Sequence, residues 1–169
     1  MIIRRENSND FNEINLLIKE AFNRDSEKEL VEKIRKSPKH INELSLIAED
    51  INEIAGHILF SEIIVKGNKD HLGGLALAPL SVKLTYQNQG VGKALVHQGL
   101  LLAKALGYQF ILVLGNHNYY SKFDFKKAST FNIKCPFEVI YEDYMAIELR
   151  KNSLANVSGI VEYLPEFSN

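Results

Sequence analysis

The feature that most constrains the fold is the succession of three segments between Leu72 and Gly107. An apolar segment, LGGLALAPLSV, is followed by the polar stretch KLTYQNQG and then by an amphipathic segment. The apolar spacing of this last segment predicts a helix over 90–106, with Gly107 at the position of a left-handed C-cap. A strand that passes through a glycine loop into a helix presents free backbone N–H groups, which is a common way to bind phosphate.

The rest of the chain predicts strands and helices on both sides of this segment. The run Phe110–Leu114 is continuously apolar, which is typical of a strand buried on both faces. Asp10 and Glu13 have the spacing of a capping box, and Pro79 predicts a bulge or a loss of strand pairing. The further elements that we expect are strands at 1–5, Leu44–Asp50, Ile54–Val65, Leu72–Val82 and Tyr144–Leu149, turns at Ile51–Glu53 and Lys66–Asp70, helices at Asp10–Phe22 and Ser26–Ser37, and a short helix after Asn116.

This order of elements predicts an α/β or α+β domain with a mixed sheet. The chain has 169 residues, which is long enough for one domain with a well-buried core. Its net charge of −1, from 20 basic and 21 acidic residues, argues against a nucleic-acid partner or an anionic membrane surface. No apolar run approaches the roughly 18 residues of a membrane span. Cys135 is the single cysteine, which favours a reducing compartment, and we expect a cytoplasmic protein.

Two common phosphate-binding motifs do not fit the glycine loop. A mononucleotide P-loop needs its first glycine where Gln87 stands and a hydroxyl residue where Ala94 stands. A dinucleotide-binding loop needs a third glycine where Leu95 stands, and it needs a preceding βαβ start that the apolar segments here do not provide. The sequence therefore excludes the first motif and weakens the second.

A third pattern fits, because Gln87-Asn88-Gln89-Gly90-Val91-Gly92 resembles the Gln/Arg-x-x-Gly-x-Gly/Ala motif of the GCN5-related N-acetyltransferases, the GNAT superfamily. The resemblance extends over about 35 residues of strand, loop and helix, and then to FILVLGN and YYSKFDF. The segments GHILFS, LAPLSV and VSGIVEYLPEF are similar to a bacterial branch described as YhbS-like. Two positions depart from the family pattern, Asp124 in place of glycine and Leu84 near a usual proline. Aspartate tolerates a left-handed backbone better than most residues do.

The resemblance implies a single domain over 1–169 with a central, mixed and mostly antiparallel sheet. This sheet would be splayed between the fourth and fifth strands and flanked by helices. The implied activity is direct transfer of an acetyl group from acetyl-CoA to a primary amine on a small molecule or peptide, without a metal. The alternative is a GNAT-like module that binds coenzyme A without catalysis. The family also implies a homodimer.

The resemblance places the cofactor contacts in the glycine loop and at the end of the preceding strand. Backbone N–H groups from Gln89 to Lys93 would converge on the pyrophosphate, and side chains at Gly90 or Gly92 would block its close approach. The pantetheine arm would lie along the strand end. The residues assigned to cofactor binding are Leu80, Val82, Gln87, Asn88, Gln89, Gly90, Val91, Gly92, Lys93 and Asn116.

The resemblance also implies catalytic roles. Tyr120 aligns with a family tyrosine that would protonate the leaving thiolate, or else it packs against the sheet. Asn116 either contacts the cofactor or caps the short helix. The general base is open: His57 or Glu62 could serve, but on an unbulged strand their spacing of five residues puts them on opposite faces, and either could be structural. Cys135 is expected to be an inert buried thiol.

Overall fold

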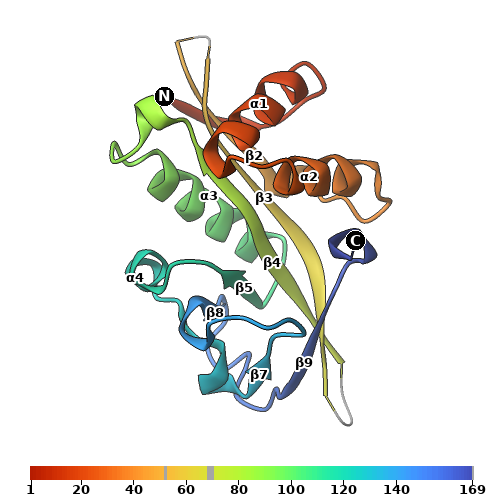
Figure 1. Ribbon diagram of the computed structural model, residues 1–169. Coiled ribbons are helices and arrows are strands. Elements are labelled where there is room, and N and C mark those ends of the chain that lie inside the picture. The colour runs from red at the N-terminus through yellow and green to blue at the C-terminus, as the bar shows by residue number, and fades with distance from the viewer. Residues whose placement is uncertain (52, 68–70, 169) are drawn as a thin grey trace. The chain divides into compact units, whose positions relative to one another are not determined.

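The computed structural model describes residues 1–51, 53–67 and 71–168, and Figure 1 follows the chain through them. The chain divides into two compact units. The first comprises Met1–Ser61 and Ala78–Leu102, and the second comprises Glu62–Leu77 and Ala103–Asn169. Strands β3 (Glu53–Lys66) and β4 (His71–Val82) and helix α3 (Val91–Ala105) contribute residues to both units. The predicted turns at Ile51–Glu53 and Lys66–Asp70 include residues that lie outside the described ranges.

Two amphipathic helices of the first unit lie where the sequence predicts them, α1 at Phe11–Phe22 and α2 at Ser26–Lys36. Their buried faces come from residues spaced three or four apart, which is the helical period. The buried residues are Ile14, Leu17 and Ile18 in α1 and Val31 and Ile34 in α2. These helices therefore form because their apolar residues fall on one side.

The predicted capping box at the start of α1 is wrong. The Asp10 side chain makes no capping hydrogen bond to the helix. It accepts instead from the Arg4 guanidinium, with Nη1 at 2.8 Å from Oδ2, and from the backbone N–H of Asn7 at 2.7 Å. Glu13 accepts from the backbone N–H of Ile54 at 2.7 Å. Both carboxylates therefore bind partners outside the helix, which the capping-box spacing does not reveal.

The sheet of the first unit is antiparallel. Strand β1 (Ile2–Arg5) pairs with β2 (Ser45–Asp50), and β2 pairs with β3 through a register shift at Ala48/Glu49. Helix α3 packs closely on β3 at Gly99, where an added Cβ would lie 2.4 Å from the ring of Phe60. Glycine at this position is what permits the close approach.

The second unit contains strand β5 (Phe110–Leu114) and a strand at the predicted Tyr144–Leu149, together with short strands that the sequence does not reveal. Strand β8 (Tyr144–Glu148) pairs antiparallel with β5 and with the two-residue β6 (Lys126–Lys127). The tail forms β9 (Gly159–Tyr163), which pairs antiparallel with β3 and parallel with the two-residue β7 (Ile133–Lys134). The core of this unit contains Ile63, Val65, Ala76, Phe110, Leu112, Ala128, Ile133, Tyr144, Ala146, Leu154 and Val161.

Strands β4 and β5 run parallel, through the pairs Leu75↔Ile111, Ala76↔Leu112 and Leu77↔Val113. In the described residues this pairing ends two residues before Pro79, as the proline predicts. The parallel pair among antiparallel neighbours confirms the predicted mixed α/β fold.

The remaining helical segments are short, apart from α3. Helix α4 (His117–Tyr120) is a single turn, and the 3-10 turns are η1 (Asn42–Leu44), η2 (Leu84–Tyr86), η3 (Ser121–Phe123), η4 (Ala128–Phe131), η5 (Tyr141–Asp143) and η6 (Pro165–Phe167). Asp124 adopts φ of 67°, so the residue that replaces glycine does take the left-handed conformation. Within the described residues, no helix has both the length and the apolar character needed to cross a bilayer.

Candidate functional site

The glycine loop of the first unit leads from η2 into α3, and the N–H groups of Val91 to Lys93 have no backbone partner among the described residues. Asn88 and Gly90 have φ of 61° and 86°, both left-handed. The N–H of Ala94 donates to Gly90 O at 2.9 Å, so the amides of Val91 to Lys93 precede the first N–H that reaches a helical carbonyl. A Cβ added at Gly90 would meet nothing within 4 Å. The loop therefore offers open space and unpaired donors at a positive helix end, as an anion requires.

Two glutamine side chains brace this loop from within. Gln87 Nε2 donates to Val82 O at 3.3 Å, and Gln89 Nε2 donates to Thr85 O at 2.7 Å. These contacts tie the loop to the end of β4 and to η2. The side chains of Gln87 and Gln89 thus shape the loop, and the backbone is what remains to bind a ligand.

Glu53 is a supporting residue that sequence analysis missed. Its carboxylate pairs with Lys83 and accepts from the Tyr86 hydroxyl at 2.7 Å. This hydrogen bond is the main reason that the pKa of Tyr86 rises to about 12. Both partners lie just before the glycine loop, so Glu53 at the start of β3 holds the segment that leads into the loop. No local pattern marks Glu53, since its partners lie about thirty residues further along the chain.

The strand end assigned to the pantetheine arm is half-buried. Leu80 and Val82 are partly exposed, and Ser81 between them is buried. The following N–H, of Lys83, donates to Ala55 O at 2.9 Å. This segment is therefore held to β3 while two of its side chains reach the surface.

Asn116 and Tyr120 lie in the second unit, at the two ends of α4. The Asn116 side chain accepts from the N–H of Tyr119 at 3.2 Å, so the capping role predicted as one alternative is present. The Tyr120 ring is 7% exposed and packs against Gly115, where an added Cβ would lie 2.5 Å from the ring. Burial raises the pKa of Tyr120, which keeps the phenol protonated. Its hydroxyl has no hydrogen-bond partner among the described residues.

The two candidate bases lie in different units and in different surroundings. His57 is completely buried, and its Nε2 lies 3.1 Å from Glu6 Oε2 and 3.4 Å from Ser45 Oγ. A base must reach the proton that it removes, so this burial argues against His57. Glu62 accepts from the Tyr108 hydroxyl at 3.3 Å and is partly exposed, and its role stays a prediction.

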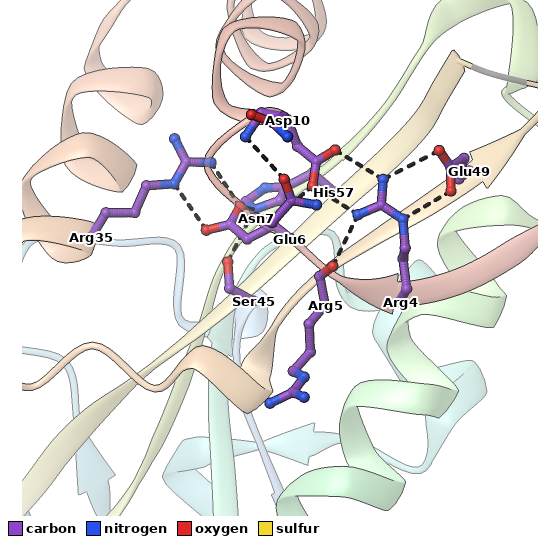
Figure 2. A network of polar contacts seen from close by, with 10 residues as sticks. Arg4, Arg5, Glu6, Asn7, Asp10, Arg35, Ser45, Glu49 and His57 are labelled. Carbon is purple, nitrogen blue, oxygen red and sulfur yellow. Dashed lines mark hydrogen bonds and ion pairs between the residues drawn. The ribbon is translucent and has the colours of Figure 1, made fainter.

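His57 belongs to a buried charge network that Figure 2 shows around the end of β1. Glu6 takes two hydrogen bonds from Arg35, at 2.9 Å from Nε and 2.7 Å from Nη2. Their side chains are 3% and 5% exposed. Because a carboxylate only accepts, His57 must donate through Nε2. In the neutral ring, its Nδ1 then carries no proton. The arrangement of Glu6, Arg35 and His57 is structural, since all three side chains are almost completely buried.

This network makes stability depend on pH. Burial would raise the pKa of Glu6, but hydrogen bonds from His57 and Arg35 outweigh it and hold the pKa well below its usual range. Burial lowers the pKa of His57, although Glu6 opposes it. Both groups therefore bind fewer protons in the folded state than in the unfolded state. Their contribution to the free energy of unfolding is present above the ordinary pKa of histidine and is lost as the pH falls below it. We expect the urea midpoint to fall as the pH drops from about 7 to about 5.

The matched variant for this measurement is His57→Gln, which can still donate to Glu6 and does not titrate. It should flatten the dependence on pH in that range. An equally steep curve in the variant would contradict the assignment of the effect to His57.

The cysteine and the possible metal ligands offer no further reactive site among the described residues. Burial raises the pKa of the half-buried Cys135 thiol, in line with the predicted inert cysteine. Across the described ranges, no group of three or more His, Cys, Asp and Glu side chains is arranged to hold a metal ion.

Comparison with known sequences finds one family model and several relatives. The model of the Acetyltransferase (GNAT) family matches residues 10–125. The Escherichia coli K12 protein named Uncharacterized N-acetyltransferase YhbS is 31% identical over 169 residues, covering 99% of both chains. The protein named YjhQ of the same strain is 34% identical over 109 residues, which are 64% of this chain and 60% of that one.

Solved structures agree with the sequence relatives. YhbS from Escherichia coli in complex with CoA superposes with a TM-score of 0.92 at 30% identity, over 99% of this chain and 92% of that one. A GNAT acetyltransferase from Brucella melitensis in complex with acetyl-CoA superposes with a TM-score of 0.80 at 27% identity, over 99% and 97% of the two chains. The glycine loop, the mixed sheet and these full-length matches lead to one conclusion: the chain belongs to the GNAT family of acetyltransferases.

Proposed function

We propose that the chain, acting as one domain over 1–169, transfers an acetyl group from acetyl-CoA directly to a primary amine. The observation that carries this proposal is the glycine loop before α3, with its left-handed Gly90, its free N–H groups and its open space. The coenzyme complexes of the relatives from Escherichia coli and Brucella melitensis support acetyl-CoA as the donor.

The glycine loop, the end of β4 and Tyr120 each have a separate role in the proposed reaction. Bound acetyl-CoA supplies an acetyl group activated as a thioester. The N–H groups from Gln89 to Lys93, with Gln87 and Asn88 shaping the loop, bind the pyrophosphate at the positive end of α3. The backbone around Leu80 and Val82 pairs with the pantetheine arm. Tyr120 donates a proton to the leaving sulfur, and its protonated phenol suits that task.

The acceptor is a primary amine on a small molecule or peptide. We also propose a cytoplasmic location, which the single cysteine supports because it favours a reducing compartment. A homodimer remains part of the prediction, to be checked by the mass of the protein in solution.

Calorimetry and a thiol-release assay test the function together. We expect acetyl-CoA to bind and coenzyme A to be released with at least one amine class among spermidine, kanamycin, lysine and a peptide with a free N-terminus. Binding without release would favour the CoA-binding module. Failure of acetyl-CoA to bind would refute the cofactor assignment, and binding of ATP or NAD instead would indicate a nucleotide site.

Tyr120→Phe tests the proton donor. The variant should lower kcat by roughly 100-fold, because a positioned general acid contributes about that much, while its affinity for acetyl-CoA is unchanged. Tyr119→Phe is the matched control, since Tyr119 is the adjacent phenol and contacts Tyr120 edge-on with ring centroids 5.1 Å apart. Equal activity of the two variants would contradict the role of Tyr120.

A further inference from the structure

His117 starts helix α4 and has its imidazole held by an aspartate from a distant part of the chain. Nδ1 lies 3.2 Å from Asp143 Oδ1, and the backbone N–H of His117 donates to the same oxygen at 3.1 Å. Asp143 ends η5, and its own carbonyl accepts from the N–H of Gly115 at 2.9 Å. These bonds fix both the backbone and the ring of His117 where the chain leaves β5.

The contact with Asp143 decides which nitrogen of His117 carries the proton. A carboxylate only accepts hydrogen bonds, so Nδ1 must be the donor. In the neutral ring, Nε2 then has a free lone pair. No described residue hydrogen-bonds Nε2, and the His117 side chain is 41% exposed. An imidazole in this state can accept a proton from a molecule that reaches the surface.

The other charged groups around His117 form a pair of their own. Glu142, next to Asp143, accepts from Lys127 Nζ at 2.9 Å, and both side chains are about half exposed. The charge of His117 is one of the smaller causes that lower the pKa of Glu142, after the two contributions of Lys127. Among the described residues, Asp143 and Glu142 of η5 are thus the titratable groups that interact with the imidazole, and Lys127 of β6 is paired with Glu142.

His117 is also placed close along α4 to the proposed proton donor. It precedes Tyr120 by three residues, a spacing that puts two side chains on neighbouring positions of a helix surface. Acetyl transfer needs a donor for the sulfur and an acceptor for the amine proton near the same carbonyl. One helical turn carries a group for each.

We propose that His117, oriented by Asp143, is the general base that deprotonates the acceptor amine. This inference rests on the proposed acetyltransferase function. Nε2 takes one proton from the ammonium and later releases it to solvent. The neutral nitrogen forms the N–C bond as the C–S bond breaks, and the sulfur takes the proton of Tyr120. The second proton leaving nitrogen restores the Tyr120 phenol, so the products are an acetamide, a thiol and one proton.

The test is the pH profile of kcat/KM for the best amine in the thiol-release assay. His117→Gln should lower kcat/KM at neutral pH by roughly 100-fold, with unchanged affinity for acetyl-CoA. Its remaining activity should rise with pH in proportion to the unprotonated amine, because the enzyme no longer removes that proton. Added imidazole should restore activity to His117→Gly. If His117 were only structural, its variants would show neither this pH dependence nor the rescue by imidazole.

Asp143→Asn gives a readout that does not depend on activity. In nitrogen-15 spectra of the imidazole, we expect His117 to carry its proton on Nδ1 in the wild type and to lose that preference in the variant. Its kcat/KM should also fall, by roughly 10-fold or more, because an amide can favour the wrong tautomer. His71→Gln, another exposed histidine, is the control and should leave the profile unchanged.

The outcomes separate this inference from the function on which it rests. If the wild type releases coenzyme A and His117→Gln keeps its rate and pH profile, His117 is not the base and the function stands. If the wild type binds acetyl-CoA but acetylates no amine, or does not bind it, the proposed function fails and the base assignment fails with it.

Discussion

Gly92→Glu is expected to lower the affinity for coenzyme A by roughly 100-fold or more, since placing like charges together at a binding site costs several kcal/mol. Gly92 is the second residue of α3, among the free N–H groups of the loop. The new carboxylate would fill the space and repel the pyrophosphate. The same carboxylate suits the positive end of a helix and replaces a poor helix former, so the fold should not suffer. Calorimetry with coenzyme A measures the loss.

Two further variants sharpen this test. Gly73→Glu makes the same change in β4 at an exposed glycine where an added Cβ meets nothing within 4 Å, and it should bind normally. Gly92→Ala adds bulk without charge, so a smaller loss would separate the two effects. Normal affinity in Gly92→Glu would show that the coenzyme lies elsewhere.

Arg35→Leu is expected to destabilise the protein by about 3–5 kcal/mol, because it leaves the Glu6 carboxylate buried without its main partner. The side chain of Arg35 is 5% exposed and makes three kinds of contact. It donates twice to Glu6 and once to Asn15, at 3.2 Å, and its guanidinium lies 4.1 Å from the centroid of the Phe11 ring. Urea unfolding measures the effect.

The first unit offers a matched control for Arg35. Arg24 also binds a glutamate through two nitrogens, Glu27, but its side chain is 65% exposed. Water screens such a surface pair, so Arg24→Leu should change stability little. Glu6→Gln in the Arg35→Leu background should recover part of the loss, because no unpaired charge then remains. Equal losses for Arg35→Leu and Arg24→Leu would contradict the view that burial sets the cost.

Local patterns were reliable wherever a segment carried its own signal. The strand Phe110–Leu114 was predicted to the residue, because a continuous apolar run between turn residues has clear ends. The helices α1, α2 and α3 differ from their predicted ranges by one residue at most at each end. By contrast, β6 and β7 are two residues long, too short to show any period, and they form only because β8 and β9 supply partners.

Isolated polar residues were poor guides to their own contacts for a related reason. Asp10 and Glu13 had the spacing of a capping box, but Arg4 and the N–H of Ile54 competed for them successfully. The sequence predicts His57 as a candidate base, but in the fold His57 is buried against Glu6. The partners of a polar side chain are set by residues that fold against it, and these can lie anywhere in the chain.

The sequence by itself identified the segment that is expected to bind the acetyl donor. The glycine loop, its strand and its helix are contiguous, so their spacing excluded the P-loop, and their resemblance to the GNAT motif predicted a pyrophosphate-binding loop. Only the tertiary structure decided which charged side chains interact. It gathered Glu6, Arg35 and His57 into a buried network, and it brought Asp143 to His117 across 26 residues. A loop motif is readable because its groups are neighbours along the chain, whereas an ion pair or a dyad exists only after folding brings its members together.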